Sequence, residues 1–147
     1  MTTPEFPLTP ELSATLESIY ADLQRDINAL RPACRQSGDC CNFTKVEHVL
    51  YATPLEITHL LQHHPLPAVM PANGSCPFLT ADLKCGVRDH RMLGCRIYYC
   101  DPNYTAAGQD LYEKYLGRIK TAYRAAEISY AFVPVMKDFV CRMQSNP

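Results

Sequence analysis

Cysteines are the residues of this sequence best suited to chemistry, because thiolate sulfur is a strong ligand for soft metal ions. The chain of 147 residues contains eight of them. Seven fall between positions 34 and 100, namely Cys34, Cys40, Cys41, Cys76, Cys85, Cys95 and Cys100. The eighth, Cys141, lies apart. Thiols stay reduced in the cytosol, so this density favours metal binding over disulfide bonds.

Disulfide bonds and core packing are the two alternative roles for these cysteines. An even number suits a disulfide framework, although such frameworks are typical of small secreted chains that cannot form a sufficient hydrophobic core. The thiols could also be packing residues without a ligand role. The first residues show no basic segment followed by an apolar run, so we expect no export signal and a cytoplasmic location.

The loop from Cys34 to Cys41 has the form of a metal-binding knuckle. Gly38 permits a sharp backbone turn, after which successive amide groups can donate to thiolate sulfurs. Cys40 and Cys41 are adjacent, and adjacent side chains diverge in extended chain, so a disulfide between them is unfavourable. A reactive thiol of low pKa at Cys40 or Cys41 is the alternative, because amide groups of the loop would stabilise a thiolate there. The many accompanying cysteines favour a ligand role instead.

Four stretches together resemble the YkgJ-like cysteine-cluster family, which is described as a zinc- or iron-chelating domain. They are Cys34-x5-Cys40-Cys41, Cys76-Pro77-Phe78-Leu79, Cys85-Gly86-Val87 and Arg91-x3-Cys95-Arg96-x-Tyr98. The resemblance implies metal ligation by Cys34, Cys40, Cys41, Cys76, Cys85 and Cys95. Two positions depart from the family pattern, because Ser37 stands where a cysteine is usual and Met92 where a proline is usual. Cys100 is the candidate that replaces the missing thiol.

The sulfur ligands restrict the metal without identifying it. Thiolates disfavour magnesium and calcium and leave zinc, an iron–sulfur cluster or copper(I). The six or seven candidate cysteines exceed the four that one zinc ion or one cubane cluster needs, so some are structural or more than one metal is bound. Arg35, Arg91 and Arg96 lie near cysteines and either offset the thiolate charge or are solvated surface residues.

Histidines are the second group of possible ligands: His48, His59, His63, His64 and His90. His59 and His63 have the i, i+4 spacing of ligands on one helical face, but the pattern lacks the glutamate of the zinc proteases. We therefore predict surface histidines. His90, between Cys85 and Cys95, is the best placed to approach the cysteine site, although a structural role is favoured there too.

Three helices are predicted to position this centre. Apolar residues recur at helical spacing over 10–30 and about 108–127, and Thr53-Pro54-Leu55-Glu56 starts a shorter helix with a capping box. Residues 43–51 suggest an extended segment. Residues 76–102 show neither helical nor alternating period, and the apolar tail 130–140, broken by Pro134, suggests a strand or an irregular segment.

These observations predict one mainly α-helical domain over 1–147, with an irregular cysteine-rich metal-binding centre at about 34–100. The formal net charge is only −1, which indicates neither a nucleic-acid partner nor a membrane partner. We expect a protein that chelates zinc or an iron–sulfur cluster through cysteine thiolates. An iron–sulfur enzyme or redox protein is the alternative, because related cysteine clusters occur in flagellin lysine methylases, but no catalytic residue is recognisable.

Overall fold

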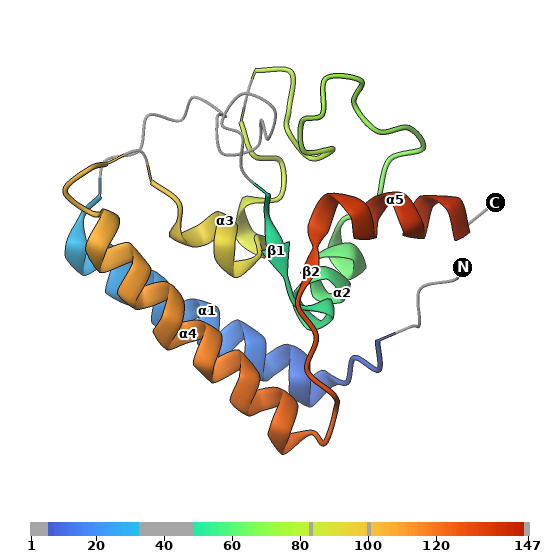
Figure 1. Ribbon diagram of the computed structural model, residues 1–147. Helices are drawn as coiled ribbons and strands as arrows, with labels where there is room; N and C mark the ends of the chain where they lie inside the picture. The colour runs from blue at the N-terminus through green and yellow to red at the C-terminus, as the bar shows by residue number, and fades with distance from the viewer. Residues whose placement is uncertain (1–5, 33–48, 83, 100, 146–147) are drawn as a thin grey trace.

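The computed structural model describes residues 6–32, 49–82, 84–99 and 101–145. Within them the chain is mainly helical, with a small two-stranded sheet (Figure 1). The elements in chain order are α1 (Pro10–Leu30), β1 (Tyr51–Ala52), α2 (Pro54–His63), the 3-10 helix η2 (Arg88–His90), α3 (Leu93–Ile97), α4 (Thr105–Ala125), β2 (Val133–Pro134) and α5 (Val135–Ser145). Residues 43–48 of the predicted extended segment lie outside the described residues, and Tyr51 belongs to β1.

The two long helices α1 and α4 lie side by side and form the base of the fold (Figure 1). Thr9 caps α1, since its side-chain oxygen accepts a hydrogen bond from the Leu12 amide. The predicted apolar stripes meet in one buried cluster that includes Leu16, Leu23 and Ile119. Packing of these two helices through their apolar stripes is therefore confirmed.

The short sheet ties α2 to the C-terminal part of the chain. β1 and β2 are antiparallel, and Tyr51 pairs with Pro134 while Ala52 pairs with Val133. The predicted capping box of α2 is present, because Thr53 accepts from the Glu56 amide and the Glu56 carboxylate accepts from the Thr53 amide.

Two helices lie where the sequence pattern predicted none. Residues 93–97 form α3, whose five residues are too few to show a period in sequence. Residues 135–145 form α5, so the expectation of a strand or irregular segment is wrong beyond Pro134. Val135 and Phe139, spaced i, i+4, bury their side chains on one face of that helix. The apolar content of the tail therefore reflects a helical face rather than a strand.

A second buried cluster forms between β1, α2, α5 and the segment that precedes α3. It includes Ile57, Leu60, Met92 and Phe139. Among the helices that the structure describes, none combines the length and the apolar character needed to cross a lipid bilayer.

Candidate metal centre

A turn and the short hairpin that follows it carry two of the predicted ligands, Cys76 and Cys85. The Leu79 amide donates to the Cys76 carbonyl at 3.1 Å, which closes a turn with Pro77 at its second position, where proline is favoured. Leu79 then pairs with Cys85, and the Gly86 amide donates to the Phe78 carbonyl at 2.9 Å. The Cys-Pro-Phe-Leu motif is therefore a turn that leads into a hairpin, and Cys85 lies on the opposite arm.

Cys85 and Cys95 both border the second buried cluster, although they come from different elements. Each is half-buried and packs against that cluster, as does Phe78 of the hairpin. Cys95 lies in α3, and its amide donates to the Met92 carbonyl. Met92 is buried. Cys141 is exposed on α5. The predicted ligands Cys34, Cys40, Cys41 and Cys100 lie outside the described residues, as do Arg35 and His48.

The two arginines near Cys95 contact the backbone around it. Arg91 donates to the Cys95 carbonyl at 3.2 Å, while Arg96 donates to the carbonyls of Arg91 and Asp89 at 2.6 and 2.8 Å. Arg96 is buried, so the alternative of a solvated surface charge is wrong for this residue. Its guanidinium carbon lies 3.9 Å from the centre of the Tyr20 ring, which offers a cation–π contact. Burial lowers the Arg96 pKa from its usual value.

Four histidines and one glutamate gather at the end of α2. The His63 and His90 rings are stacked with centroids 4.0 Å apart, and His64 Nε2 lies 2.9 Å from His90 Nδ1. His59 Nε2 lies 3.4 Å from a carboxylate oxygen of Glu17 on α1. Glu17, His59 and His63 each offer a ligand atom, and these atoms lie within 4.8 Å of one another. The described residues thus contain a group able to hold a cation without any cysteine.

The prediction of surface histidines is wrong for His59, whose side chain is fully buried. Burial lowers its pKa, against an opposing contribution from the Glu17 hydrogen bond. Burial also lowers the His90 pKa, and the neighbouring histidine charges act in the same direction. Both rings are thereby biased towards the neutral form, which is the form that binds metals.

Glu17 is the member of this group that the sequence pattern did not reveal. It lies off the apolar stripe of α1 and is 42 residues from His59, so no local pattern connects the two. The i, i+4 spacing of His59 and His63 was the available signal, but the contact with α1 exists only in the folded chain. Glu17 and His59 also line a pocket of about 270 Å³ together with Tyr20, Ala21, Gln24, Asp89, His90 and Arg96.

No protein-family model matches the sequence, and neither the curated proteins nor the solved structures include a significant match. The cysteine-cluster resemblance therefore rests on the four motifs and remains a prediction.

Proposed function

We propose that this protein binds zinc or an iron–sulfur cluster through its clustered cysteine thiolates. The observation that carries the proposal is the position of Cys85 and Cys95, which come from separate elements and border the same buried cluster. Cys76 begins the turn that leads into the hairpin with Cys85. These contacts support the proposal, although among the described residues no group of three ligand atoms within 4.8 Å of one another includes a cysteine.

The chemistry of the surroundings supports a thiolate site. Turns and hairpins present ligands from a short chain length, so several sulfurs can converge without ordering a long loop. Arg91 and Arg96 bring positive charge close to Cys95 through their contacts with neighbouring carbonyls. Positive charge stabilises thiolate over thiol, and ligation requires thiolate.

Metal analysis of the anaerobically purified full chain, combined with its optical spectrum, tests the proposal. Colourless bound zinc that is lost in Cys95→Ser would identify a zinc–thiolate protein, whereas iron, labile sulfide and a brown chromophore would identify an iron–sulfur cluster. Preparations that contain neither metal, and that take up neither Zn²⁺ nor a reconstituted cluster, would overturn it. So would mass spectrometry that finds all eight cysteines in disulfide bonds.

A further inference from the structure

The geometry points to a second metal site in which Glu17, His59 and His63 hold a divalent first-row cation. No cysteine takes part in this group, so the inference is independent of the proposed thiolate centre. Two imidazoles and one carboxylate form a donor set that suits zinc and non-haem iron. Such three-ligand sites leave coordination positions open.

The distance between Glu17 and His59 already matches metal ligation. Two ligand atoms bound to one tetrahedral zinc ion at about 2.1 Å lie about 3.4 Å apart. The Glu17 oxygen and His59 Nε2 are 3.4 Å apart, which is long for a hydrogen bond. The three candidate ligand atoms, within 4.8 Å of one another, need to approach by on the order of 1 Å to share an ion. Glu17 is 59% exposed and His63 is also exposed, so both side chains have room to move.

The burial of His59 is not explained by its hydrogen bonds. Its Nε2 has only the long contact with Glu17, and its buried Nδ1 has no hydrogen-bond partner among the described residues. A buried polar atom without a partner costs about 1–3 kcal/mol, so Nδ1 marks His59 as an unusual buried residue, although a cation at Nε2 would leave Nδ1 as it is. A cation at Nε2 would replace the weak contact by a strong one. The His59 ring is buried, so its position is fixed by packing. The other two candidate ligands, Glu17 and His63, are exposed.

Neighbouring side chains orient the site. The His90 ring stacks on His63 with an angle of 14° between the planes, while His64 contacts His90 Nδ1. His90 is therefore a positioning residue for His63. The charged residues of the adjoining pocket are Glu17, Asp89 and Arg96. The Arg96 guanidinium is directed to the Tyr20 ring and to two backbone carbonyls. Because Glu17 and His59 line this pocket, open coordination positions on the cation would border it.

Titration of the reduced, anaerobic full chain with Co²⁺ tests the inference. Cobalt bound by imidazole and carboxylate gives visible ligand-field bands, whereas thiolate ligation adds intense sulfur-to-cobalt charge transfer in the near ultraviolet. We expect a component without charge transfer whose dissociation constant rises about tenfold or more in Glu17→Gln and His63→Ala. Glu11→Gln and Gln62→Ala, at exposed positions of α1 and α2, should leave that component unchanged.

Zn²⁺ binding followed by long-range proton–nitrogen spectra of the imidazoles provides a second measurement. The ring nitrogens of His59 and His63 should shift on Zn²⁺ addition in the wild-type chain, and the His59 shift should be reduced in Glu17→Gln. Glu17→Gln and His63→Ala change exposed side chains, so both variants are expected to fold. They avoid the loss of structure that a substitution of the buried His59 risks. Wild-type Co²⁺ affinity in both Glu17→Gln and His63→Ala would overturn the site. So would unchanged His59 and His63 resonances at saturating Zn²⁺. The charge-transfer bands report separately on the cysteines.

Discussion

The Glu56 carboxylate accepts a hydrogen bond from the backbone amide of Leu93 at 2.7 Å, which joins the start of α2 to the start of α3. The same oxygen accepts from the Tyr20 hydroxyl at 3.1 Å, and the other oxygen accepts from the amide and hydroxyl of Thr53. Burial raises the Tyr20 pKa, with a further contribution from the Glu56 charge, so the hydroxyl remains a donor. One buried carboxylate thus connects α1, α2 and α3, which carry the candidate ligands Glu17, His59 and Cys95.

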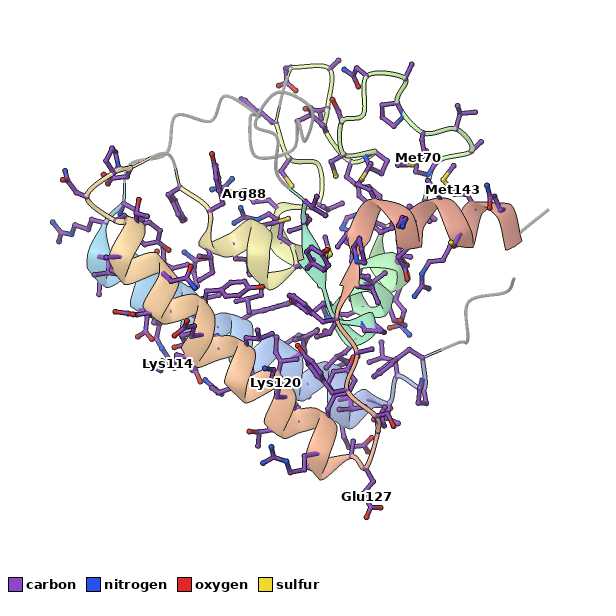
Figure 2. The ribbon with its side chains drawn as sticks, viewed as in Figure 1. Met70, Arg88, Lys114, Lys120, Glu127 and Met143 are labelled. Carbon is purple, nitrogen blue, oxygen red and sulfur yellow. The ribbon has the colours of Figure 1, made fainter. Side chains whose placement is uncertain are left out.

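Glu56→Ala should therefore lower the free energy of unfolding by about 3–5 kcal/mol, because it leaves several buried donors without an acceptor. Glu56→Gln keeps the shape and one acceptor, so its loss should be about 1–3 kcal/mol. Glu127 extends away from the fold (Figure 2), and Glu127→Gln should change stability by less than about 0.5 kcal/mol. Urea unfolding followed by circular dichroism measures all three. Equal stability of Glu56→Ala and Glu127→Gln would contradict the role of this carboxylate.

Gly86 is expected to be intolerant of a side chain. A Cβ atom there would lie 2.8 Å from the Phe78 backbone carbonyl oxygen, to which the Gly86 amide donates. Gly86→Ala should displace the hairpin arm that carries Cys85, lower stability by about 1–3 kcal/mol and reduce bound metal. Gly117→Ala is the matched control, since nothing lies within 4 Å of a Cβ atom there and alanine should stabilise α4 by about 0.5–1 kcal/mol. The melting temperature and the bound metal of Gly86→Ala and Gly117→Ala are compared with those of the wild-type chain.

Substitution of single cysteines should distinguish metal ligands from cysteines that do not bind the metal. Cys76→Ser, Cys85→Ser and Cys95→Ser are expected to lower bound metal, because a hydroxyl is a much weaker ligand for a soft metal. Cys141→Ser should have little effect, since Cys141 lies on the exposed surface of α5. Metal-to-protein ratios after identical purification provide the measurement. If Cys141→Ser removes as much metal as Cys95→Ser, the predicted boundary of the site is wrong.

Removal of the proposed metal should loosen residues 76–99 before α1 and α4. Ordering a residue costs about 1–2 kcal/mol in conformational entropy, and a structural metal site contributes on the order of 10 kcal/mol. The hairpin and the connections around it contain few periodic backbone hydrogen bonds, whereas α1 and α4 share a buried cluster. Chelation should therefore increase hydrogen exchange over 76–99 while α1 and α4 stay protected. Equal protection with and without chelator would show that the metal does not order this segment.

Acid should weaken the contact between α1 and α4. Arg118 lowers the Asp22 pKa, chiefly through its hydrogen bond, and Tyr115 and Lys114 lower the Asp26 pKa in the same way. Because both folded-state values are depressed, the stabilisation is present above the unfolded pKa of about 3.9 and is lost as pH falls through the folded values. Lys114, labelled on α4 in Figure 2, donates to Asp26 at 3.1 Å.

The combined variant Asp22→Asn and Asp26→Asn should show a smaller fall in melting temperature between about pH 6 and about pH 3 than the wild-type chain. Both carboxylates are solvent-accessible, so high salt should reduce the difference. An unchanged pH profile in the double variant would assign the acid sensitivity to other groups.

Elements with local sequence signals could be predicted before the fold was known. The Thr9 cap, the capping box of α2 and the stripes of α1 and α4 depend on residues within a few positions of each other, so they were predictable. The sequence also indicated that the cysteines fall in one region of the chain. The interactions that stabilise α3 and α5 join residues far apart in the sequence. Glu56 accepts from the first amide of α3, and Val135 and Phe139 of α5 belong to the second buried cluster.

The burial of His59 and its contact with Glu17 depend on the packing of the folded chain. The i, i+4 spacing was enough to place His59 and His63 on one helical face, but burial depends on what packs against that face. The approach of Glu17 requires α1 to lie against α2, and the stacking of His90 requires the chain to return after the hairpin. Contacts between residues far apart in sequence leave no periodic trace, because no local backbone geometry relates them. The candidate carboxylate–histidine site is therefore a product of packing, whereas the cysteine cluster is visible in the order of residues.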